Sequence, residues 1–175
     1  MIKLEKPDID VASIITDCTA NLTKQPILTH INASKTTIVS KSEKYNELAE
    51  KGQLGTLETH TMIEGGATKD DMVWLYDNKF VADGGRKYYD KIKAIPKYSK
   101  CPFCGVGIVS TLDHYLPKTK YPTYALTPVN LIACCADCNK NKKSEISETR
   151  NNEFIHPYYD DFNDEVWLKV KIVFD

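Results

Sequence analysis

The chain has 175 residues, of which 42% are hydrophobic and 27% charged, proportions that are ordinary for a soluble folded domain and exclude a disordered chain. No apolar run approaches the roughly 18 residues that a membrane-spanning helix needs, and the first residues lack the apolar core of a signal peptide. We therefore expect a cytoplasmic protein without membrane contact, in which reduced cysteines favour metal binding over disulfides.

The net charge of -1 hides an uneven distribution of charge along the chain. Residues 79–143 carry 12 basic and 4 acidic residues, a net of +8, whereas residues 144–175 carry 3 basic and 8 acidic residues. Lysines gathered in one segment can neutralise phosphates and release counterions. A polyanionic partner is one interpretation, and a solvated lysine face is the alternative that charge alone favours.

The first hundred residues predict a series of helices. Residues 7–22 place apolar side chains at helical spacing, with Asp8 or Asp10 available as the N-cap. A loop through Pro26 and Asn32 is expected to follow.

Two capping patterns predict the next two helices. Ser40–Glu43 resembles a capping box and predicts a helix that continues to Ala49. Thr68 is the predicted cap of a further helix, with Met72 and Leu75 on its apolar face.

The pattern changes near the first cysteine pair. A helix is predicted over residues 88–95 and ends at Pro96. Branched side chains then predict a strand over residues 108–116 and a second over residues 129–133, with a loop between them. The polar residues 136–146 predict a helix, which gives the order strand, loop, strand, helix.

Two Cys-x-x-Cys pairs, Cys101 with Cys104 and Cys135 with Cys138, have the spacing of a structural four-thiolate zinc site. Cys134 lacks the two-residue spacing to the last cysteine, so we expect it to be a bystander. A zinc ribbon that serves only structure or binding is the alternative to a site with its own chemistry.

The run between the cysteine pairs contains an adjacent carboxylate and imidazole, Asp113 and His114. Such a pair lets a metal ion bind the carboxylate oxygen while the neutral imidazole removes a proton from water. Neighbouring residues of a strand face opposite sides, so we expect both to serve one site only at a bend. Asn130 and Asn139 add carboxamides, and Asn139 directly follows the last zinc cysteine.

The order of these elements resembles the zinc-stapled HNH endonuclease family over residues 101–143. The matching segments are Cys101-Pro-Phe-Cys104, Asp113-His114, Asn130, Cys135-Ala-Asp-Cys138-Asn139 and Lys142. The resemblance implies a ββα-metal module with His114 as general base. It implies that Asp113 and Asn139 bind a catalytic divalent cation, Mg²⁺ or Mn²⁺. It also implies that Asn130 holds the loop and His114 by backbone hydrogen bonds.

Further residues near the motif are candidates for contacts with the substrate. Four lysines could bind phosphate, although each is also consistent with an ordinary surface lysine: Lys118, Lys120, Lys142 and Lys143. His156 lies in a His-Pro-Tyr segment similar to one that follows the motif in many HNH proteins. It either approaches the metal or satisfies a local turn, and His30 and His60 are given no role.

Together these features predict an α+β fold. A mainly helical region, residues 1–100, precedes a zinc-bound HNH module, residues 101–146, and a C-terminal extension, residues 147–175, in which residues 165–174 alternate like a strand. The predicted activity is metal-dependent hydrolysis of phosphodiester bonds in DNA, leaving 5′-phosphate and 3′-hydroxyl ends. The wider pattern resembles small HNH nucleases of bacterial antiphage defence systems, which implies a partner such as an ATPase. A zinc module that binds nucleic acid without cleaving it is the alternative.

Overall fold

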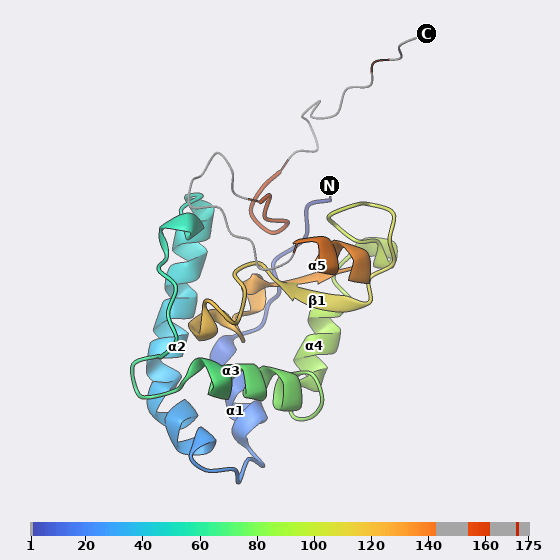
Figure 1. Ribbon diagram of the computed structural model, residues 1–175. Helices are drawn as coiled ribbons and strands as arrows, with labels where there is room; N and C mark the ends of the chain where they lie inside the picture. Colours follow the sequence, from blue (N-terminus) through green and yellow to red (C-terminus); the bar gives the residue numbers. More distant parts are fainter. Residues whose placement is uncertain (1, 143–153, 162–170, 172–175) are drawn as a thin grey trace.

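The computed structural model describes residues 2–142, 154–161 and 171. In this part of the chain, helices surround a small antiparallel sheet of two strands, β1 (Thr111–His114) and β2 (Leu131–Cys134) (Figure 1). The α+β class is therefore confirmed. None of the helices in these ranges combines the length and the apolar character needed to cross a membrane.

The first helix follows the local signals of the sequence. α1 (Val11–Thr19) begins after Asp10, whose carboxylate accepts a hydrogen bond of 2.8 Å from the Ser13 N–H. Asp10 is therefore the N-cap, as one of the two alternatives predicted. The buried residues of the helix keep the predicted spacing: Val11, Ile14, Ile15 and Cys18.

The second helix is longer than the sequence predicted. α2 (Ile27–Glu50) is one helix of 24 residues that includes both the predicted loop and the predicted start at Ser40–Glu43. Two serines occupy core positions of its buried stripe. Ser34 accepts a hydrogen bond of 3.0 Å from the backbone of a facing loop, and Ser42 donates one of 3.0 Å to Thr127. Hydroxyl groups at these positions conceal the apolar periodicity on which the prediction depended.

The third helix has the predicted cap and an unpredicted continuation. α3 (Lys69–Leu75) begins with a complete capping box, in which Thr68 and Asp71 each accept a hydrogen bond from the other's backbone. A π-helical turn, Tyr76–Phe80, follows directly, and α4 (Arg86–Lys93) comes after it. A π turn inserts an extra residue into a helix and so re-aims the side chains that follow.

The strands are shorter than the sequence predicted, and they pair in register with Asp113 opposite Ile132 and His114 opposite Leu131. α5 (Ala136–Lys142) follows β2, and the rest of the predicted helix lies outside the described residues. The predicted C-terminal strand also lies outside them, except for residue 171. Short 3₁₀ turns complete the chain: Leu54–Thr56, Lys97–Ser99, Pro122–Tyr124 and Pro128–Asn130.

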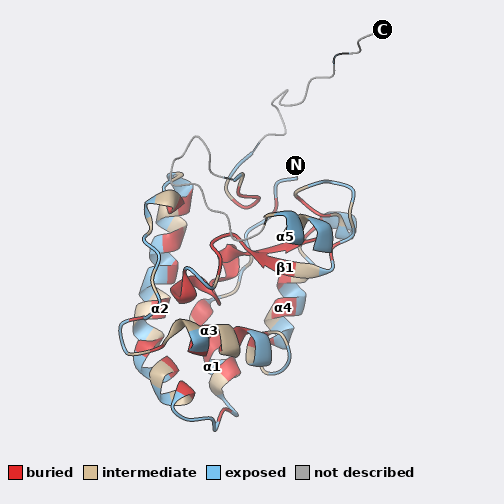
Figure 2. Ribbon diagram, in the orientation of Figure 1, coloured by how far each residue is buried: buried red, intermediate tan, exposed pale blue. Residues whose placement is uncertain are grey.

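The buried side chains form two main clusters around the sheet (Figure 2). The first joins the inner faces of α1 to α4 with sheet and loop residues such as Leu112 and Leu126. The second is rich in tyrosine and includes Tyr45, Tyr115 and Tyr124. Both clusters draw residues from before and after residue 100, so the helices and the motif-bearing segment share one core.

Candidate functional site

The four predicted zinc ligands come together in space. Cys101, Cys104, Cys135 and Cys138 place their four Sγ atoms within 4.8 Å of one another. Zn–S bonds of about 2.3 Å give a tetrahedron with edges of about 3.8 Å, and the Cys104 and Cys135 sulfurs lie 4.0 Å apart. The arrangement therefore fits a structural metal such as zinc. Cys134 is buried at the end of β2, and its sulfur is not one of the four in this cluster.

The backbone favours the thiolate form at Cys104, whereas burial raises the pKa of the Cys138 thiol. The Gly107 N–H donates to Cys104 Sγ at 3.3 Å, and the Cys138 N–H donates to Cys135 Sγ at 3.5 Å. Hydrogen bonds from Gly107 and its neighbour lower the pKa of the Cys104 thiol to about 6. Gly107 also has no room for a side chain, because a Cβ would lie 2.8 Å from Cys135 Sγ. These features suit a metal ligand set, which must be deprotonated.

Asp113 is buried on β1 beside the end of α5. Its Oδ2 lies 3.0 Å from Lys142 Nζ, but the ammonium directs its hydrogen bonds at the carbonyl oxygens of His114 (2.7 Å) and Tyr115 (3.1 Å). Among the described residues no donor is aligned on Oδ2, which therefore has an ion pair but no hydrogen bond. Burial raises the pKa of the Asp113 carboxyl, and the Lys142 charge opposes that shift.

The His114 ring is held from two sides at the end of β1. Its Nε2 lies 3.0 Å from the Ala125 carbonyl oxygen, and the Tyr76 ring packs against it with 4.5 Å between the ring centroids. Because a carbonyl only accepts, Nε2 carries the hydrogen and Nδ1 keeps a lone pair. Burial lowers the pKa of His114 to about 3, so the imidazole is neutral at pH 7.

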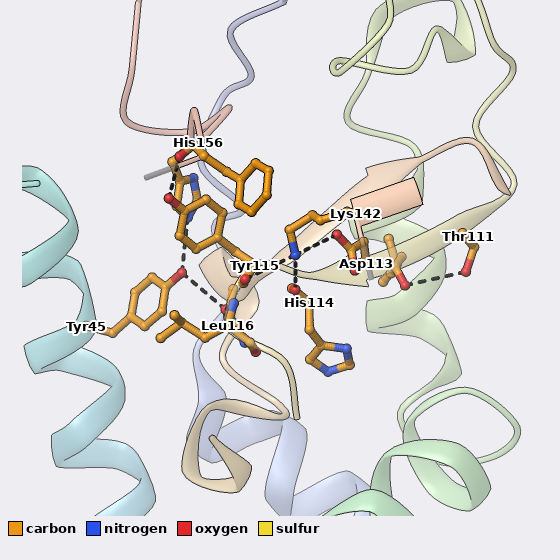
Figure 3. A network of polar contacts seen from close by, with 11 residues as sticks. Tyr45, Thr111, Asp113, His114, Tyr115, Leu116, Lys142 and His156 are labelled. Carbon is orange, nitrogen blue, oxygen red and sulfur yellow. Dashed lines mark hydrogen bonds and ion pairs between the residues drawn. The ribbon is translucent and has the colours of Figure 1, made fainter. Parts of the chain in front are cut away.

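Four of the predicted residues line one pocket of about 330 Å³ at the end of β1: Asp113, His114, Lys118 and Asn139. Figure 3 shows the Asp113 carboxylate beside Lys142 and the His114 imidazole on the other side of the strand, as alternation requires. Both groups still border the pocket because it opens at the strand's end. Its walls are formed by Asp113, His114, Pro117, Lys118, Thr119, Asn139 and Lys140.

Asn130 does not line this pocket but fixes the loop that forms it. The side chain is completely buried. Its Nδ2 donates to the carbonyl oxygens of Leu116 (3.1 Å) and Tyr124 (3.0 Å), and its Oδ1 accepts from the Leu116 N–H (2.7 Å) and the Tyr45 hydroxyl (3.2 Å). The amide thus joins Leu116 to Tyr124, the residue before Ala125, whose carbonyl contacts His114.

His156 lies in the tyrosine-rich cluster and forms no wall of the pocket. Its Nδ1 accepts from the Tyr158 N–H (3.3 Å), so its Nε2 carries the hydrogen and donates to the Tyr45 oxygen (3.1 Å). Tyr45 in turn donates to Asn130. Figure 3 shows the contact between His156 and Tyr45. Of the two alternatives for His156, the structure therefore favours the local structural one.

The candidate phosphate-binding lysines differ in their surroundings. Lys118 lies at the pocket and is ion-paired with Asp77, and Lys120 is exposed. The side chain of Lys142 is only 7% exposed and is occupied by Asp113 and two carbonyl groups. This position corrects its interpretation as a free phosphate contact. Lys143 lies outside the described residues.

The contribution of the π turn to the site could not be predicted from the sequence. Tyr76 packs on His114, and the Lys118 ammonium lies 4.2 Å from the centroid of the same tyrosine ring. Asp77, the next residue, holds Lys118 by the ion pair. Aromatic residues at helical spacing indicate a buried core, and nothing in that pattern distinguishes an aromatic residue that also contacts the candidate histidine, His114.

Comparisons with known proteins add one relative. The chain is similar to Protein ea31 of Escherichia phage lambda, with 30% identity over 185 aligned residues. The similarity covers 99% of this chain and 62% of the phage protein, so the chain spans about three fifths of that relative's length. No family model and no solved structure matches the chain.

Proposed function

We propose that the chain is a metal-dependent HNH endonuclease that hydrolyses phosphodiester bonds in DNA, leaving 5′-phosphate and 3′-hydroxyl ends. The observation that carries this proposal is the shared pocket of Asp113, His114 and Asn139 beside the four-cysteine cluster. A zinc ribbon that served only as a structural element would need the cysteines alone. The additional carboxylate, imidazole and carboxamide favour a reactive site.

Asp113 and Asn139 would hold the divalent cation, Mg²⁺ or Mn²⁺. They offer oxygen ligands, which hard cations prefer, and Asp113 Oδ2 is a buried carboxylate oxygen with no hydrogen bond from the described residues. When bound, the cation supplies positive charge that stabilises the phosphate oxygens and the departing 3′ oxygen.

His114 would act as the general base. Its Nδ1 lone pair can accept a proton from a water molecule that attacks the phosphorus, while the Ala125 carbonyl and the Tyr76 ring keep the imidazole in one orientation. The negative charge of a bound phosphodiester raises the pKa of the imidazole toward the range in which a base is effective. Lys118 and Lys140 at the pocket place further positive charge near the phosphate.

A nucleic-acid-binding zinc module without cleavage is the second candidate. Lys142 favours it, because its ammonium lies 3.0 Å from Asp113 Oδ2 and balances the carboxylate charge without a metal ion. Under either candidate, the basic residues 79–143 fit a polyanionic partner. The antiphage role and a partner ATPase extend the proposal on the strength of the sequence resemblance.

A plasmid assay tests the proposal. Supercoiled plasmid is incubated with the zinc-loaded chain and Mg²⁺ or Mn²⁺, and the nicked product is compared for the unsubstituted protein, His114→Ala and the control His60→Gln. We expect His114→Ala to lower the rate by a factor of about 10² to 10⁴ and the control to nick normally. If neither metal supports nicking while the protein still retards DNA in a gel, the second candidate replaces the first.

A further inference from the structure

We propose that the zinc-knuckle face is a second nucleic-acid contact surface, on which Tyr98 stacks against an unpaired base. The zinc-knuckle face consists of residues 97–100 and 106–108. Three large apolar or aromatic side chains are exposed on it: Tyr98 at 91%, Val106 at 75% and Ile108 at 59%. The inference deepens the proposed function, because it takes DNA as the ligand and adds a contact outside the reaction pocket.

The two segments of this face lie side by side on the metal cluster. The Cys101 N–H donates to the Gly107 carbonyl oxygen at 2.8 Å, and Lys100 pairs with Ile108 as an antiparallel bridge. Lys100 Nζ also donates to the Val106 carbonyl oxygen at 3.2 Å. A bound zinc ion would therefore hold the whole face rigidly against the start of β1.

The backbone at Tyr98 adopts an unfavourable conformation that serves no core packing. Tyr98 has φ 56° and Ser99 has φ 53°, both in the left-handed region that residues other than glycine rarely enter. Within the described residues, no other aromatic ring packs on Tyr98. Strained backbone of this kind persists mainly at functional positions. Here it leaves the tyrosine ring free to stack on a flat partner.

The charge around the tyrosine suits a phosphate backbone. Residues 91–112 contain no acidic residue and four basic ones: Lys91, Lys93, Lys97 and Lys100. Among the residues that the structure describes, none of the four forms an ion pair with a carboxylate, whereas Lys79 in the π turn and Lys87 on α4 do. Exposed lysines beside an exposed aromatic ring are the combination that binds single strands, in which stacking and phosphate contacts act together.

The face also lies at a suitable distance from the pocket. The five residues from Ile108 to Asp113 span at most about 17 Å at about 3.3 Å per residue. That distance corresponds to about five nucleotides at 3.4 Å each. A strand with its scissile phosphate at Asp113 and His114 could therefore also reach Ile108 on this face, which is paired with Lys100, two residues from Tyr98.

The test measures binding separately from cleavage. In the zinc-loaded full chain carrying His114→Ala, fluorescence anisotropy compares a labelled single-stranded oligonucleotide of about 20 nucleotides with and without further substitutions. Tyr98→Asn removes the ring and suits the left-handed backbone, Tyr98→Phe keeps a stacking ring, and the pair Lys97→Ala with Lys100→Ala removes charge. Lys44→Ala, an exposed lysine on α2, is the matched control.

We expect Tyr98→Asn to weaken binding about five- to a hundredfold, and Tyr98→Phe and Lys44→Ala to stay within about twofold of the parent. Removing the two lysines should weaken the salt dependence of binding: the negative slope of log K against log salt should become less steep by about 1.4. Binding by Tyr98→Asn within twofold of the parent, with one zinc per chain, would overturn the inference. If no metal supports nicking but Tyr98→Asn still loses binding, the nuclease proposal fails and the contact surface stands.

Discussion

Replacing Asn130 by alanine is expected to destabilise the fold and disrupt the proposed active site together. The Asn130 side chain is completely buried and makes four hydrogen bonds, three of them to the backbone of Leu116 and Tyr124. These contacts close the segment in which the Ala125 carbonyl accepts the hydrogen bond from His114. Losing them removes the support for the orientation of the imidazole.

The size of the effect follows from the groups left behind. Alanine would leave the Leu116 N–H and the Leu116 carbonyl oxygen buried without the bonds that Asn130 makes to them, whereas the Tyr124 carbonyl oxygen still accepts from the Thr127 N–H at 3.2 Å. Each unsatisfied buried group costs about 1–3 kcal/mol, and losses within one network are not additive. We therefore expect the free energy of unfolding to fall by about 4 kcal/mol, a large part of the roughly 5–15 kcal/mol typical of a domain. Tyr45 still accepts from His156, but its buried O–H loses the acceptor that Asn130 provides.

Urea unfolding of the zinc-loaded protein measures this loss, and amide hydrogen exchange reports on the Leu116 N–H. The matched control is Asn139→Ala on α5, where the side chain is only half-buried. We expect the control to change stability by less than about 0.5 kcal/mol and yet to abolish nicking. A loss below about 1 kcal/mol in Asn130→Ala, with the Leu116 amide as protected as before, would refute the reasoning.

Three further predictions concern the metal cluster, the π turn and acid stability. Cys135→Ala should bring the zinc content below one per chain and lower the melting temperature by roughly 10 °C or more, as atomic absorption and calorimetry can show. Tyr76→Leu removes the ring that packs on His114 and should slow nicking about tenfold or more, whereas Tyr76→Phe keeps the ring and should nick at the normal rate. Burial lowers the pKa of His114 and of His156 from about 6.5 to about 3. Between pH 6.5 and pH 3 the unfolded chain therefore binds more protons than the folded chain. The free energy of unfolding falls as the pH drops through this range. Each histidine should make the free energy of unfolding change by up to about 1.4 kcal/mol per pH unit. His156→Gln should reduce this pH dependence, which urea titrations at several pH values measure. An unchanged pH dependence would contradict the buried, neutral state of His156.

The features that could be predicted from sequence are those encoded by residues close together in the chain. The Cys-x-x-Cys spacing of Cys101 and Cys104 indicated the four-sulfur cluster, because two residues between thiols suit one tight turn around a metal. Asp10 and Thr68 marked helix starts, because a cap acts on backbone N–H groups two or three residues away.

The features that sequence reasoning missed depend on contacts between distant segments. α2 was divided wrongly because Ser34 and Ser42 are buried by partners far along the chain. Lys142 was predicted to be a phosphate contact or an ordinary surface lysine, although it lies against Asp113, 29 residues away in the chain. His156 could not be placed from its own segment, because its partner Tyr45 belongs to α2. Each of these residues is polar, so its environment depends on a partner that no local pattern reveals.

The position of His114 shows why the motif-bearing segment depends on the helices. The cysteine cluster lies at the beginning of β1, whereas the imidazole at its end is held by Tyr76 from the π turn and, through Asn130, by Tyr45 from α2. A two-stranded sheet is only marginally stable in water unless other elements cover one of its faces. A fragment limited to residues 101–146 could therefore keep a metal cluster, but its histidine would lose the contacts that orient it. The helical region thus belongs to the candidate active site as well as to the core.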